Sequence, residues 1–166
     1  MKIRLLLVCV LMIILIFACK KDDLDTIGGE QSAMGMVGEQ IYSYDIPGVS
    51  NATATVVSLE DGISTFTGTA TISNAAILNI ISNIPEFTVN GNNVTVTGLK
   101  FKVTNEGVES KNPSYPGVIV NYGAKVGDTF SAGSGIVRKV VSKSTDDDYP
   151  WVFFNIKVIK VEESPS

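Results

Sequence analysis

Residues 86–104 read EFTVNGNNVTVTGLKFKVT and carry the clearest structural signal in the chain. Residues rich in valine and threonine flank the turn Asn90-Gly91-Asn92-Asn93, and asparagine and glycine tolerate the positive φ that tight hairpin turns require. Beyond the turn, the apolar positions 94 and 96 have one parity, whereas 99, 101 and 103 have the other. Since a slip of one residue exchanges the two faces of a strand, we predict a β-bulge at Gly98.

The same composition extends over most of the chain. Val, Ile, Thr, Phe and Tyr dominate, and turn residues recur about every ten positions, which is typical of antiparallel sheet. The pattern predicts strands near residues 39–46, 52–59, 63–72, 86–90, 93–104, 117–122, 136–143 and 150–161. The last of these is apolar on both parities from Trp151 to Ile156, so we expect a central strand that is covered on both faces.

Residues 73–84 have a helical pattern instead. Ser73 is a suitable N-cap, apolar residues at 77, 80, 81 and 84 form one stripe, and Pro85 ends the run. Another element must pack on this apolar stripe to bury it, and we expect the concave face of a curved sheet to do so. The sequence therefore predicts a mainly β fold with one helix (β+α), in which a curved antiparallel sheet or partly open β-barrel packs on a single helix near 73–84.

The first 18 residues have the layout of a secretory signal. Lys2 and Arg4 precede 14 uncharged residues, which is fewer than the roughly 20 that a membrane-spanning helix needs. The run ends in Ile16-Phe17-Ala18-Cys19, which resembles a bacterial lipobox. The resemblance implies that residues 1–18 are removed and that Cys19 receives a diacylglycerol and a further acyl chain such as palmitate. The alternative is an ordinary signal peptide with conventional cleavage nearby.

The residues after Cys19 indicate that the protein is exported to the cell surface. Lys20, Lys21, Asp22 and Asp23 resemble the export signal of Bacteroidota surface lipoproteins, although such a charge run is also typical of a solvated tether. Asp25-Thr26-Ile27 resembles an O-glycan acceptor of that group, with Thr26 modified. We expect a lipidated N-terminus and flexible tether over 19–37, one β-rich domain over 38–163 and a tail over 164–166. This arrangement implies an outer-membrane lipid anchor.

Composition narrows the function classes. Loss of Lys2 and Arg4 lowers the Lys and Arg count from 13 to 11 against 17 Asp and Glu, so the 148 mature residues carry a charge of −6. Nucleic-acid binding needs a basic footprint, which this chain lacks. The chain has no histidine, and its two cysteines are Cys9, in the signal, and Cys19. We therefore predict no catalytic residue, no metal ligand set, no cofactor and no nucleic-acid partner, which makes an enzyme the less favoured class.

Several side-chain groups are candidate sites. Asp146-Asp147-Asp148 offers oxygens to calcium but lacks EF-hand spacing, so a solvated turn is favoured. Tyr115, Tyr149 and Trp151 beside turn residues suggest ligand-contact aromatics, with burial as core plugs the favoured alternative. Carboxylates at 60, 61, 106, 109 and 128 are candidates for glycosidase pairs only if 5–10 Å apart.

Residues 126–130, followed by Arg138-Lys139-Val140, resemble uncharacterised lipoproteins of the same bacterial group, and Asp128 is expected to accept turn hydrogen bonds.

Two functions follow from this sequence. The first is a surface binding or assembly module whose loops, including 105–117 and 144–150, contact a glycan, a peptide or an envelope protein. The second is a carrier of an apolar or lipid ligand in a half-barrel cavity between sheet and helix. The carrier requires a pocket of several hundred cubic ångströms rather than dense packing. The side chains expected around it are Phe66, Leu78, Ile81, Phe101 and Phe154.

Overall fold

The structure is a computed structural model that describes residues 25–42, 47–133, 135–146, 149–151, 154–156 and 158–165. Its helical elements are the 3₁₀ turn η1 (Ala33–Gly35) and the α-helix α2 (Ala75–Ile81). Its strands are β1 (Gln40–Tyr42), β2 (Val49–Glu60), β3 (Ile63–Ile72), β4 (Phe87–Asn90), β5 (Asn93–Thr104), β6 (Gly107–Ser110), β7 (Gly117–Asn121), β8 (Thr129–Gly133), β9 (Ile136–Lys143), β10 (Tyr149–Trp151), β11 (Phe154–Ile156) and β12 (Ile159–Pro165).

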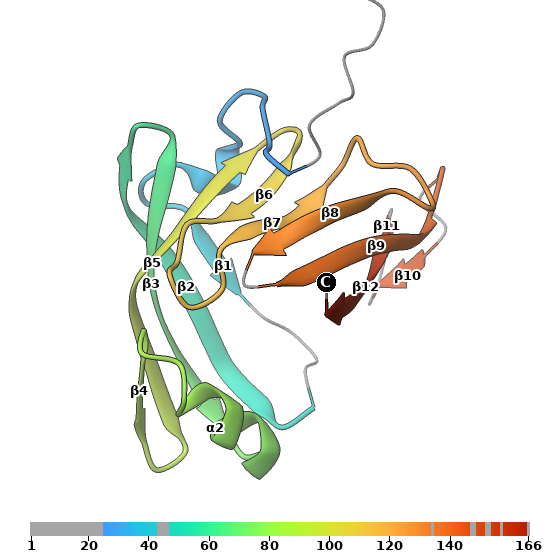
Figure 1. Cartoon of the computed structure of the whole chain (residues 1–166). Coiled ribbons are helices and arrows are strands. Elements are labelled where there is room, and N and C mark those ends of the chain that lie inside the picture. The colour runs from blue at the N-terminus through green and yellow to red at the C-terminus, as the bar shows by residue number, and fades with distance from the viewer. Residues whose placement is uncertain are drawn as a thin grey trace, which may run out of the picture.

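The strands form a large sheet, a small sheet and a separate hairpin, all of them antiparallel (Figure 1). The large sheet has the order β1-β2-β3-β5-β6-β7, with β4 also paired to β5. The small sheet has the order β12-β9-β8, and β10 pairs with β11. Within the described residues the sheets do not close into a barrel, and α2 is the one α-helix. The prediction of a mainly β fold with a curved sheet and one helix is confirmed.

The hairpin that opens β5 has the predicted form. Asn90 pairs with Asn93, and Gly91 in the turn has a φ of +58°. Further along, β3 pairs Phe66 with Leu99 but Thr67 with Thr97, so Gly98 is the extra residue. Its φ of +78° favours glycine, which confirms the predicted bulge.

The predicted long strand over 150–161 is wrong. The chain forms β10 and β11, whose register pairs Tyr149 with Ile156 and Trp151 with Phe154, and then a separate β12. Because β10 and β11 run antiparallel to each other, one alternation of faces cannot run through the segment. Among the described strands β12 pairs only with β9, which makes it an edge of the small sheet. The strands β6 and β8 were not expected from the sequence.

The helix is shorter than predicted and is capped by the next residue. The side chain of Asn74 accepts hydrogen bonds from the backbone N–H groups of Ala76 (2.9 Å) and Ile77 (3.3 Å). Ser73 instead donates its backbone N–H to the Gly48 carbonyl (2.8 Å). No α2 residue is fully buried, and Ile80 is 64% exposed. The expectation that the sheet covers the whole apolar stripe is therefore wrong.

Two apolar clusters form the core. The first lies on the large sheet and contains Val56, Phe66 and Val103, with Phe101 packed against it. The rings of Phe66 and Phe101 meet edge to face, with centroids 5.7 Å apart. The second cluster joins the two sheets and contains Ile27, Val118, Ala124, Phe130 and Val140. Burial of each large apolar side chain contributes about 1.5–3 kcal/mol.

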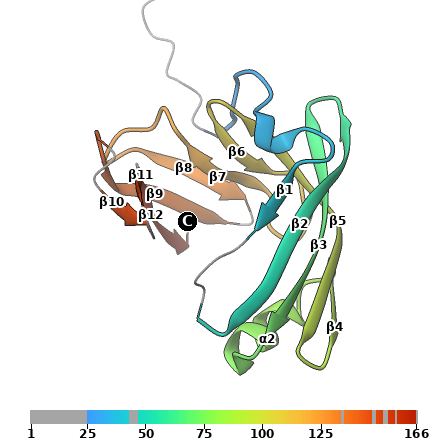
Figure 2. The same ribbon diagram turned by 180° about the vertical axis from the view of Figure 1, so that it is seen from behind.

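Residues 25–39, which we call the N-terminal strap, pack against the folded domain. Gln31 forms an antiparallel bridge with Thr104, and Ser32 N–H donates to the Val103 carbonyl (3.0 Å). Ile27 is only 3% exposed. Seen from behind in Figure 2, the strap crosses the end of the large sheet near β6. The described part of the expected flexible tether is therefore docked, because an apolar side chain and the backbone of the strap both find partners on the domain.

Candidate functional site

An apolar hollow separates α2 from the large sheet, and we call it the α2 groove. Its volume is about 220 Å³, and no charged residue lines it. Two threonines, Thr53 and Thr69, provide its polar lining side chains. The rest is apolar or glycine and includes Ile41, Ala54, Ala70, Ile81, Phe87 and Val96.

Small residues on adjacent strands create this groove. The sheet registers align Ala54 with Gly68, Gly68 with Val96, and Val96 with Phe87. These residues form one row across β2, β3, β5 and β4, in which the side chains at the β2 and β3 positions are the smallest. A Cβ on Gly68 would lie 2.5 Å from the Thr53 carbonyl oxygen, so this position has no room for a side chain. The sheet surface is therefore hollow where α2 crosses its end.

A second hollow of about 450 Å³ lies beside β7, β9 and β12. Two of its polar side chains, Lys143 and Ser144, bond to the backbone around it. The ammonium group of Lys143 donates to the carbonyls of Tyr122 (2.6 Å) and Ala124 (3.0 Å), and Ser144 exchanges hydrogen bonds with the backbone of Val158. These contacts hold the β7 end against the small sheet. The Lys143 and Ser144 side chains therefore already have hydrogen-bond partners and are not available to a ligand.

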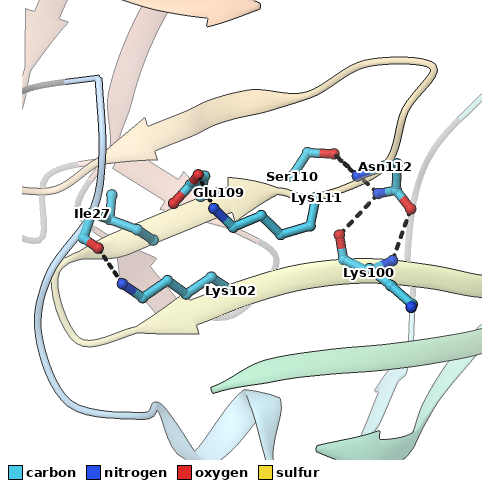
Figure 3. A network of polar contacts seen from close by, with 7 residues as sticks. All are labelled: Ile27, Lys100, Lys102, Glu109, Ser110, Lys111 and Asn112. Atoms are coloured by element: carbon cyan, nitrogen blue, oxygen red, sulfur yellow. Dashed lines mark hydrogen bonds and ion pairs between the residues drawn. The ribbon is translucent and has the colours of Figure 1, made fainter. Parts of the chain in front are cut away.

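The buried polar cluster of β5 and β6 is also structural (Figure 3). Glu109 pairs with Lys111, and the ammonium of Lys102 donates to the Ile27 carbonyl. Asn112 is hydrogen-bonded to Ser110 and to the backbone of Lys100. Every buried side-chain nitrogen and oxygen in the described residues has a partner. The segment 105–117, expected as a contact loop, thus holds a strand and buried residues.

The candidate carboxylates lie in different surroundings. Glu109 is buried, whereas Glu106 is exposed in the β5–β6 turn. Asp128 accepts a hydrogen bond from the Lys125 N–H (2.7 Å), which confirms its predicted turn role. Asp146 lies exposed in a bend, while Asp147 and Asp148 fall outside the described residues. In the part of the chain that the structure covers, no three acidic, histidine or cysteine side chains come close enough to hold a metal ion.

Tyr115 is half-buried rather than displayed. Its ring centroid lies 6.5 Å from that of Phe101. Burial raises the pKa of the Tyr115 hydroxyl, and the negative charge of nearby Glu86 raises that pKa further. This environment favours the core-plug interpretation. Tyr149 and Trp151 lie in β10, but their side chains fall outside the described residues.

The residues of the expected anchor also fall outside the described part of the chain, namely Cys19, Lys20, Lys21, Asp22 and Asp23. Thr26 is exposed, and it lies between Asp25, whose carboxylate accepts a hydrogen bond from the Ser131 N–H (2.5 Å), and buried Ile27. Its glycosylation stays a prediction. None of the helices among the described residues has the length and apolar character that crossing a membrane demands.

Sequence reasoning named one lining residue of the α2 groove, Ile81, and missed the rest. The available signal was the run of small residues in 52–54 and 68–70, which becomes meaningful only when the strand register is known. Comparisons with protein-family models, curated proteins and solved structures found no match.

Proposed function

We propose that this protein is a lipid-anchored cell-envelope protein, displayed on the surface, that acts as a binding module and takes an apolar group of its ligand into the α2 groove. The anchor is supported by the lipobox-like residues ending at Cys19 and the charged residues after it. The binding role is supported above all by the groove, because it is an apolar hollow at the end of a regular sheet.

The size of the groove defines the class of ligand group. A cavity of about 150 Å³ holds benzene, whereas sites for drug-sized ligands run from about 300 to 1,000 Å³. At about 220 Å³, the α2 groove fits one ring or a short alkyl segment. This size favours the binding module over the carrier of a whole lipid. Phe66 and Phe101, which the carrier interpretation places around its cavity, instead pack in the core.

Filling the groove tests this function. Ala70→Leu adds volume to the lining, and Thr88→Leu adds the same group at an exposed position of β4, adjacent in sequence to the lining residue Phe87. We expect native mass spectrometry of the lipidated protein, released from detergent in the gas phase, to detect a retained apolar molecule in the wild type and in Thr88→Leu. The molecule should be lost from Ala70→Leu, with circular dichroism confirming that this variant is folded.

Two other results would contradict this proposal. A wild-type protein that retains nothing beyond its own lipid contradicts the proposed binding role. Retention by Ala70→Leu at the wild-type level would place the ligand elsewhere than in the α2 groove.

A further inference from the structure

Exposed apolar side chains gather at the end of the molecule opposite α2, on the N-terminal strap and the adjacent part of β2. Met34, Met36, Val37 and Val57 are 47–59% exposed. The two segments are joined by backbone hydrogen bonds, in which Gly38 N–H donates to the Val56 carbonyl (2.9 Å) and Val56 N–H donates to the Glu39 carbonyl (3.0 Å). We call these four side chains the tip surface. Clustered exposed apolar residues of this kind mark contacts with proteins or membranes.

The strap and the end of β2, which carry the tip surface, lie at the same end of the domain as the turns after β2 and β5, while α2 and the β4–β5 turn lie at the other end (Figures 1 and 2). Five carboxylates surround it in these turns and in the strap, at Glu30, Glu39, Glu60, Asp61 and Glu106. Residues 30–39, 57–62 and 105–106 contain no lysine or arginine. These segments therefore carry apolar and acidic side chains but no cation, and the nearby cation that the strap does contact is Lys102, whose ammonium donates to the Ile27 carbonyl.

The covalent chain limits what can lie against this end. Asp25 is held to β8 through its carboxylate, and only six residue steps separate it from Cys19. A fully extended chain spans at most about 3.3–3.6 Å per residue, so this connection reaches roughly 20 Å. A folded domain of 100 residues has a radius of gyration of about 13 Å and would not fit in such a gap. The short connection therefore keeps the bilayer close to this end of the domain, within reach of the tip surface.

We propose that the tip surface inserts into the lipid bilayer that carries the anchor, so that the domain stands on the membrane with the α2 groove at its outer end. This inference rests on the proposed lipid anchor at Cys19. Methionine and valine side chains leave water when they enter the boundary between headgroups and acyl chains, which apolar protein surfaces penetrate by about 5–10 Å. The acidic surround makes a zwitterionic surface more favourable than an anionic one.

The absence of other thiols allows a direct test with the full-length lipidated protein. Val37→Cys places a thiol in the tip surface, and Asn92→Cys places one in the exposed β4–β5 turn at the opposite end. Each is labelled with a polarity-sensitive fluorophore and reconstituted in phosphatidylcholine vesicles. We expect emission from position 37 to shift to shorter wavelength and to be quenched by nitroxide lipids, and emission from position 92 to stay as in water. Phosphatidylglycerol in the vesicles should reduce the shift at 37, and added salt should restore it.

Different results would contradict the proposed anchor and the proposed insertion of the tip surface. The wild-type protein should float with the vesicles and take up no thiol label, because Cys19 is its only mature cysteine and the proposed anchor blocks it. A labelled or non-floating wild type contradicts the anchor, and the inference falls with it. A floating protein whose label at 37 stays in water overturns the inference alone and assigns the tip to a protein partner. Equal shifts at 37 and 92 also overturn it, since the domain would then lie flat.

Discussion

Asn112 shows how one buried amide fixes the local path of the chain. It is 1% exposed, its Oδ1 accepts from the Lys100 N–H (2.8 Å), and its Nδ2 donates to the Lys100 carbonyl (3.0 Å). The side chain thereby imitates a paired backbone residue and continues the contact of β6 with β5 beyond Ser110. The sequence gives no sign of this, because Ser110-Lys111-Asn112-Pro113 has the composition of a loop and the partner is 12 residues away.

Replacement of Asn112 by alanine should destabilise the protein. The substitution leaves the Lys100 N–H without its acceptor, and an unsatisfied buried group costs about 1–3 kcal/mol. Asn92→Ala is the control, because that asparagine is exposed in a turn and should change stability by no more than about 0.5 kcal/mol. Urea unfolding measures both. Equal stabilities of the two variants would show that the amide contacts contribute nothing.

At the scale of elements, patterns confined to one hairpin were predictable and those that depend on distant partners were not. The expected limits of β3, β5 and β9 agree with the structure, and so does the bulge at Gly98. The short strands β6 and β8 were missed because each lies in a sequence rich in turn residues and gains its strand form from neighbours. The α2 groove was missed for the same reason, since its lining row spans four strands and its small residues lie on two of them, β2 and β3. Of the residues that line the groove, only Ile81 in the helix was expected from the sequence.

The cap of α2 gives a matched pair of substitutions. Asn74→Ala removes the acceptor for two N–H groups of the first turn and should cost about 1 kcal/mol. Ser73→Ala, at the residue that the sequence pattern favoured as the cap, should cost clearly less, because its hydroxyl makes only a long contact of 3.4 Å with the Gly48 carbonyl. The difference in urea midpoint decides between the two. A larger loss of stability for Ser73→Ala would show that Ser73, rather than Asn74, caps the helix.

At the scale of the whole molecule, the N-terminal strap belongs to the folded domain. Ile27 lies in the cluster that joins the two sheets, together with Val118 and Phe130. The sequence suggested a tether here because glycines and charges surround a single isoleucine, and no local period shows where that side chain goes. The strap also brings the tip surface and the proposed anchor to the same end of the molecule.

Removal of the Ile27 side chain should therefore act as a core substitution. We expect Ile27→Ala to lower the free energy of unfolding by about 2–5 kcal/mol, the range for large-to-small changes at buried sites. Val37→Ala, at an exposed position of the same strap, should be nearly neutral. Circular dichroism during urea unfolding compares them. If Ile27→Ala were as mild as Val37→Ala, the strap would contribute no stability and would behave as a tether.

The docked strap also determines how the protein responds to mechanical force. A pull on the chain at residue 25 is borne first by the hydrogen bond between Asp25 and Ser131, then by Ile27 and by the hydrogen bonds of Glu30 and Ser32 to the β5 end, before any load reaches β1. Once released, residues 25–38 would span about 45–50 Å at full extension. For the proposed surface-anchored protein, the strap is thus the segment that a pull on the anchor loads before it loads the sheets.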